Sequence, residues 1–141
     1  RKFRGELVRA IRQFRPDVVF CPDPFRRTFY LHRDHRICGQ VTLDAVFPYS
    51  RDRLHFLELT RQGFQPHKVG TILMWGTEEP DTFVDITETL ELKCQSLLCH
   101  ASQVSNPGQD AVKFVREFAK TQGDKGGMEY AEAFRAISLR R

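Results

Sequence analysis

The sequence contains no apolar run that approaches the roughly 18 residues of a membrane span. It also lacks the basic start, apolar core and small-residue cleavage site of a secretory signal peptide. A Walker loop, a G-x-G-x-x-G segment and a G-x-S-x-G segment are all absent, which argues against nucleotide-binding and serine-hydrolase sites. No internal repeat or low-complexity segment occurs.

The four cysteines form no metal-binding or redox pattern, because none are spaced as C-x-x-C or as in a zinc finger. Cys21 falls in an apolar run, and Cys38 and Cys94 fall on apolar helical faces. Buried free thiols of this kind are typical of a reducing compartment. We therefore expect a cytoplasmic protein.

The length of 141 residues, with 40% hydrophobic and 28% charged residues, indicates one globular domain over residues 1–141. The formal net charge is +4, but the arginines gather at both ends and in residues 26–36 and form no single stripe. Nucleic acid is therefore not an expected partner, and a solvated basic surface explains the charge.

Helical periodicity predicts a first helix that ends before Pro16, with Arg12 on its polar side and an apolar face of Phe3, Leu7, Ile11 and Phe14. Residues 17–21 predict a buried strand and residues 22–33 a loop. A second helix is expected from Asp34, which would cap it, with Ile37, Cys38, Val41, Ala45 and Val46 buried. Gly39 inside this helix costs about 1 kcal/mol relative to alanine, which suggests close packing there.

Further along, strands are predicted at 68–75 and 82–86, a short helix within 54–63, and helices from about 90 and 111. Asp85 and Glu88 resemble a helix-capping pair, and residues 122–127 predict a flexible turn. Glu78, Glu79 and Asp81 follow a strand end and could contact a polar substrate, but a solvated acidic loop is the favoured interpretation. The order of elements predicts an α/β fold with a mostly parallel sheet flanked by helices.

The segment FYLHRDHR, residues 29–36, is the strongest candidate site, because it follows the carboxyl end of a strand. His32, His35 and Asp34 could bind zinc or perform acid–base catalysis, and Tyr30 could polarise a carbonyl. A place at the start of a helix favours the neutral imidazole of His35, the form that ligates metal. The same residues also fit a polar loop with a capping aspartate, since H-x-x-H alone is a weak motif.

Four stretches together resemble the later half of the LmbE-like, or PIG-L, family of zinc-dependent de-N-acetylases. They are RPDVVFCPDPFRRTFYLHRDHRICGQVTLDAVFPYSRD, HKVGTILMWGTEEPDTFVDIT, LLCHASQV and GMEYAEAFR. The resemblance implies a Rossmann-like fold and removal of an N-acetyl group from an amino-sugar conjugate such as one of N-acetylglucosamine.

The resemblance also implies individual roles for the residues of FYLHRDHR. His35 would ligate zinc, His32 would act as general acid or stabilise the tetrahedral intermediate, and Asp34 would support the site. Tyr30 would polarise the acetyl carbonyl. Arg33 stands where the family has proline, a conformational departure that removes no chemistry.

Nothing in the chain matches the A-H-P-D-D-E segment that supplies the family's other zinc ligands and its general base. We therefore expect the chain to be the C-terminal portion of such a domain, without its N-terminal strands, and inactive alone. A truncated sheet edge would favour a homo-oligomer. The alternatives are a non-catalytic LmbE-like module that binds a sugar or a protein, and an unrelated α/β metal-binding domain.

Overall fold

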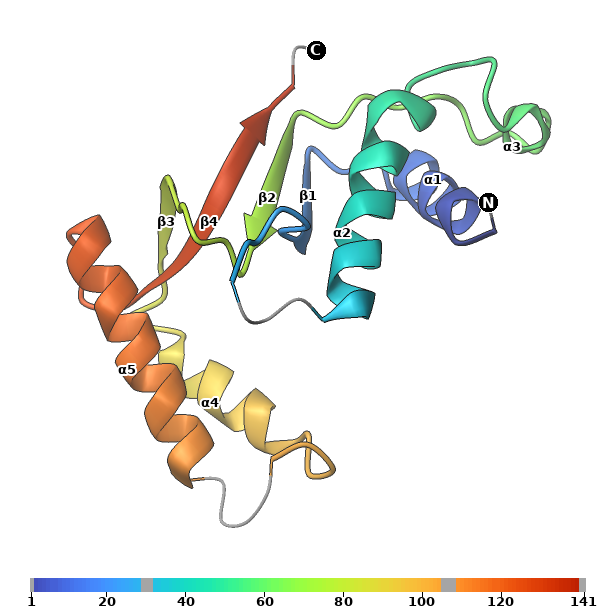
Figure 1. Ribbon diagram of the computed structural model, residues 1–141. Coiled ribbons are helices and arrows are strands. Elements are labelled where there is room, and N and C mark those ends of the chain that lie inside the picture. Colours follow the sequence, from blue (N-terminus) through green and yellow to red (C-terminus); the bar gives the residue numbers. More distant parts are fainter. Residues whose placement is uncertain (1, 29–31, 105–108, 140–141) are drawn as a thin grey trace. The chain divides into compact units, whose positions relative to one another are not determined.

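The computed structural model describes residues 2–28, 32–104 and 109–139 (Figure 1). Contacts divide the chain into two compact units. The first comprises the residues up to Pro80 together with those from Phe134 onward, and the second comprises Asp81–Ala133. Each unit has its own cluster of buried hydrophobic residues. One domain over residues 1–141 stays a prediction.

The first unit holds most of the regular elements. They are α1 (Lys2–Phe14), β1 (Val18–Pro22), α2 (Arg33–Asp44) with the π-helical turn η1 (Ala45–Tyr49), α3 (Leu57–Arg61), β2 (Thr71–Trp75) and the later part of β4 (Ala131–Ser138). β1 and β2 are parallel, with Pro22 opposite Trp75, whereas β4 runs antiparallel to β2. Helix α2 packs on β1, and α1 packs on α2 and η1 (Figure 1).

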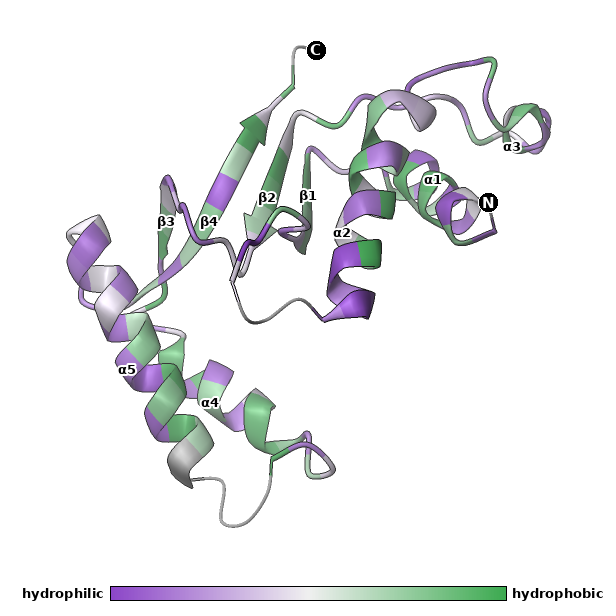
Figure 2. Ribbon diagram, in the orientation of Figure 1, coloured by the Kyte–Doolittle hydropathy of each residue, from purple (hydrophilic) through white to green (hydrophobic). Residues whose placement is uncertain are grey.

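The core of the first unit joins residues from α1, η1, α3 and both parallel strands. β1 and β2 are mostly hydrophobic, whereas α1 and α2 carry residues of both kinds (Figure 2). The buried cluster consists of Val8, Ile11, Cys21, Ala45, Val46, Leu59, Val69, Ile72 and Met74. The helices therefore cover the face of the parallel pair that carries Cys21, Ile72 and Met74. The prediction that residues 17–21 form a buried strand is only partly right, because Val18 is 41% and Phe20 56% exposed.

The second unit holds β3 (Thr82–Asp85), α4 (Leu90–Leu98), α5 (Gln109–Gly126) and the beginning of β4. Ile86, Leu90, Cys94 and Ala119 form its small core. Hydrogen bonds connect the strands in the order β1-β2-β4-β3. The α/β prediction is confirmed, but the described sheet is mixed, because β2 has a parallel partner on one edge and an antiparallel partner on the other.

The predicted apolar face of α1 is partly wrong. Phe14 is 75% exposed and Phe3 is 42% exposed, whereas Arg12, expected on the polar side, is only 2% exposed. Its guanidinium donates to the Thr60 hydroxyl and to backbone carbonyls of Tyr49, Ser50, Asp52, His55 and Phe56. Arg12 is thus the polar centre of the irregular segment that links η1 to α3.

Helix α2 begins at Arg33, not after a capping Asp34. The residue before the helix is His32, and its ring accepts a hydrogen bond from the Asp34 N–H. Gly39 and Thr42 are buried, whereas Ile37, expected on the buried face, is 37% exposed. A Cβ atom on Gly39 would lie 2.3 Å from the Pro22 carbonyl oxygen, which confirms the predicted close packing.

Two predictions for the later half are wrong, and one strand was missed. α5 continues to Gly126 through the predicted turn at residues 122–127, and Gln122 is buried within it. Asp85 accepts from the Thr87 N–H in a local turn, and α4 begins only at Leu90, after Thr89. β4 was not predicted, since its pairing with β2 joins distant parts of the chain. Among the residues described, no helix combines the length and apolar character that a membrane crossing requires.

The cysteines should differ sharply in reactivity. All four are free; Cys21 and Cys94 are buried, Cys38 is half-buried, and Cys99 is exposed. Burial raises the pKa of Cys21 to about 12, so at pH 8 only about one in ten thousand of its thiols is ionised. We expect iodoacetamide to alkylate Cys99 at least about a hundredfold faster than Cys21 in the folded chain. Peptide mass spectrometry after timed labelling measures both rates. Equal rates would contradict the burial of Cys21.

Candidate functional site

The two histidines of residues 29–36 lie side by side at the start of α2. Their ring centroids are 5.1 Å apart, and the rings are tilted by 44°. The His35 ring also meets the indole of Trp75 in a T-shaped contact, with centroids 5.2 Å apart. Tyr30, the other residue expected in this cluster, lies outside the described residues. The structure therefore brings the two predicted imidazoles together against an aromatic wall.

The strand ends explain why these side chains meet. β1 and β2 are parallel and end opposite each other, at Pro22 and Trp75. The Asp23 N–H donates to the Trp75 carbonyl at 2.9 Å, which holds the two departing chains together. Helix α2 starts at the same edge, and its first turn carries His35. This is where ligands bind in open α/β sheets.

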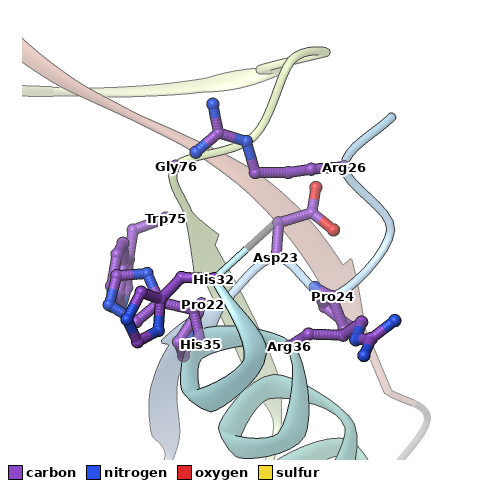
Figure 3. Close-up of a pocket in the computed structure, with 9 residues that line it drawn as sticks. All are labelled: Pro22, Asp23, Pro24, Arg26, His32, His35, Arg36, Trp75 and Gly76. Carbon is purple, nitrogen blue, oxygen red and sulfur yellow. The ribbon is translucent and has the colours of Figure 1, made fainter. Parts of the chain in front are cut away.

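A pocket opens between these elements, and its lining combines imidazole, carboxylate, guanidinium and indole groups (Figure 3). The lining residues are Pro22, Asp23, Pro24, Arg26, His32, His35, Arg36, Trp75 and Gly76. In Figure 3 the two imidazoles lie beside Trp75, and Arg26 extends toward Gly76. The indole is 40% exposed, so it combines packing against His35 with an accessible surface.

Asp23 is a buried carboxylate within this pocket. Asp23 is only 6% exposed. Its Oδ1 accepts a hydrogen bond from the Phe25 N–H at 2.8 Å. This contact makes Asp23 a turn residue. Its place in the pocket adds a carboxylate to a lining that also holds His32 and His35.

Asp34 lies apart from the pocket lining. Its carboxylate is 73% exposed and 3.7 Å from the Arg33 guanidinium. Since it occupies the first turn of α2, it complements the positive end of the helix dipole. The role of Asp34 in supporting the site stays a prediction. Its predicted role as the helix cap is wrong, because His32 occupies that position.

Glu78, beyond the end of β2, is exposed as expected, but its bonds to the loop after β1 were not predicted. Glu78 accepts hydrogen bonds from the backbone N–H groups of Arg27 and Thr28, at 3.0 and 2.7 Å, and from the Thr28 hydroxyl. These bonds, the hydroxyl contact foremost, lower the pKa of Glu78. The only available signal was the place of Glu78 at a strand end, since its partners lie about 50 residues away.

The described residues fit part of a zinc site. His35 is a half-buried imidazole and His32 lies beside it, and imidazole nitrogen is a preferred zinc ligand. A catalytic zinc site uses about three protein ligands. Across residues 2–28, 32–104 and 109–139, no group of three or more His, Cys, Asp or Glu side chains is arranged to hold a metal ion.

Two known deacetylases are similar to nearly the whole chain. The diacetylchitobiose deacetylase of Thermococcus kodakarensis is 30% identical over 138 residues, which cover 97% of this chain and 51% of that protein. The N,N'-diacetylchitobiose deacetylase of Pyrococcus horikoshii, solved with its inhibitor MPG, superposes with a TM-score of 0.87 at 30% identity. That match covers 97% of this chain and 51% of the other. The chain thus spans about half the length of these relatives.

More distant structures share only the fold. A conserved protein of Thermus thermophilus superposes with a TM-score of 0.74 at 23% identity. The match covers 98% of this chain and 59% of that protein. GalB, the 4-carboxy-2-hydroxymuconate hydratase of Pseudomonas putida, superposes with a TM-score of 0.76 at 17% identity. This match covers 98% of this chain and 59% of the GalB chain. No family model matches the chain. Because a hydratase shares this fold, fold alone does not fix the reaction.

Proposed function

We propose that the protein acts as a metal-dependent hydrolase that removes an N-acetyl group from an amino-sugar conjugate. The observation that carries this proposal is the histidine pair in the strand-end pocket of a chain 30% identical to a diacetylchitobiose deacetylase. The likeness to the distant hydratase does not weigh against it, because that likeness supports only the fold.

In this proposal each residue of the segment has one task. His35 is a zinc ligand, and Trp75 keeps its ring in place through the edge contact. His32 lies next to it and donates a proton to the departing amine or stabilises the tetrahedral intermediate. Tyr30 polarises the acetyl carbonyl, and Asp34 supports the site from the first helical turn.

A bound zinc ion supplies Lewis acidity, which polarises the acetyl carbonyl and makes water a better nucleophile at neutral pH. The general base and the remaining ligands belong, in this proposal, to residues other than those described. We accordingly expect the 141-residue chain alone to be inactive.

The complete gene product provides the test, with zinc content and the hydrolysis of diacetylchitobiose as the measurements. His35→Ala should lower the amount of bound zinc, because a ligand is lost. The same variant should lower kcat/KM by more than about a hundredfold. His32→Ala should keep the zinc but lower kcat by about 10²–10⁴-fold, the range for one acid–base group.

His55→Ala is the matched control, because His55 belongs to the same unit as the pocket but lies outside its lining. Full zinc content and activity in His35→Ala would contradict the proposed function. Turnover by the 141-residue chain alone would contradict its expected inactivity.

The second candidate is a non-catalytic module that binds a sugar or a protein. It is favoured by the lack of a three-ligand cluster among the residues described. A complete gene product that binds diacetylchitobiose, but binds no zinc and does not hydrolyse the acetyl group, would support this module over the enzyme.

A further inference from the structure

We propose that Glu78 is a positioning residue that fixes Arg27 and Thr28, which precede His32 in the sequence, against the loop that follows β2. The consequence for catalysis rests on the proposed hydrolase function, whereas the tether itself does not.

The contacts of Glu78 use both carboxylate oxygens. Oε2 accepts the Arg27 N–H at 3.0 Å, and Oε1 accepts the Thr28 N–H at 2.7 Å together with the Thr28 hydroxyl. Hydrogen bonds from N–H groups to an ionised carboxylate are about twice as strong as neutral ones. Glu78 therefore holds backbone as well as side chain, and it does so across two loops.

The position of the tether explains its relevance to the site. Thr28 lies four residues before His32 in the sequence, at the end of residues 23–28, which follow β1 and form no helix or strand. The Asp23 turn holds this loop at its beginning. Glu78 adds a second fixed point at Arg27 and Thr28. Without Glu78, both backbone N–H groups would lose their acceptor.

The neighbouring Glu79 offers a contrast. Its carboxylate, 64% exposed, contacts the Arg27 guanidinium, 79% exposed, at 3.1 Å. Such an exposed ion pair contributes little. Because Glu79 contacts a flexible side chain and Glu78 contacts backbone N–H groups, only Glu78 restrains the path of the loop. Glu79→Ala is therefore the matched control.

Amide hydrogen exchange tests the tether in the 141-residue chain. In Glu78→Ala the Arg27 and Thr28 amides should exchange about tenfold faster, since each loses its acceptor. Glu78→Gln, which keeps one carbonyl oxygen, should be intermediate, and Glu79→Ala should match the unaltered chain. Exchange rates unchanged in Glu78→Ala would overturn the proposal whatever the activity.

Kinetics of the complete gene product test the consequence. Glu78→Ala should lower kcat about tenfold with little change in KM, zinc content or Tm, and Glu78→Gln should restore part of the loss. Faster exchange with an unaltered kcat would overturn the positioning role. If the unaltered protein hydrolyses no acetyl group, the proposed function fails, and the exchange rates still decide whether Glu78 holds the loop.

Discussion

An Arg12→Met variant is expected to lose at least about 3 kcal/mol of its free energy of unfolding. Methionine replaces much of the volume of arginine but donates no hydrogen bond. The carbonyls between Tyr49 and Phe56 that face the guanidinium would therefore lose a buried donor. Leaving even two or three such acceptors unpaired costs more than the hydrophobic gain of a buried methionine returns.

Urea unfolding of the 141-residue chain, followed by circular dichroism, measures this loss. Arg12→Lys keeps the charge but presents a single ammonium in place of the planar fork, so we expect an intermediate loss. Arg9→Met is the matched control on the same helix, because Arg9 is exposed and its guanidinium contacts the exposed Gln62 side chain and the Phe64 ring, with no buried carbonyl among its recorded partners in the described residues. A change below about 1 kcal/mol in Arg12→Met would show that the buried contacts contribute little.

Gly39→Ala is expected to destabilise the chain by about 2 kcal/mol and to displace the histidine end of α2. Two effects oppose each other. Alanine gains about 1 kcal/mol of helix propensity, but its Cβ would lie 2.3 Å from the Pro22 carbonyl oxygen and 3.0 Å from the Pro24 ring. Overpacking of this kind costs about 1–3 kcal/mol, and here the upper end applies, because a strand backbone must move.

The same denaturation experiment measures the Gly39→Ala effect, and the indole fluorescence of Trp75 reports on the pocket. Gln40→Ala is the control, since Gln40 is exposed on the same helix and its replacement should change stability by less than about 0.5 kcal/mol. An alanine variant as stable as the unaltered chain, with unchanged fluorescence, would mean that α2 can move away from β1 without cost.

The parts of the fold that were predictable are those encoded locally. Apolar runs located β1 and β2, and Arg15-Pro16 located the end of α1, where Arg15 takes a φ of +51°. Gly39 indicated close packing because glycine is costly inside a helix. The meeting of the two histidines at a strand end followed from α/β topology and required no knowledge of distant partners.

The parts that were missed depend on contacts between distant residues. The polar partners of Arg12 lie 37 to 48 residues away, so helical periodicity assigned it to the solvent side. β4 is defined by its antiparallel pairing with β2, about 60 residues earlier in the chain. His32 replaced Asp34 as the cap because its ring accepts the same kind of N–H bond that an aspartate would.

The carboxylate bridge between the loops after β1 and β2 also bears on attempts to redesign this pocket. Loops on α/β scaffolds are usually treated as interchangeable parts, each grafted independently onto a rigid sheet. Here the backbone of one loop takes its acceptor from a side chain of the other. Residues 23–28 grafted onto another scaffold would therefore lose the Glu78 acceptor unless residues 76–79 were grafted with them. The two loops should be exchanged together in a redesign.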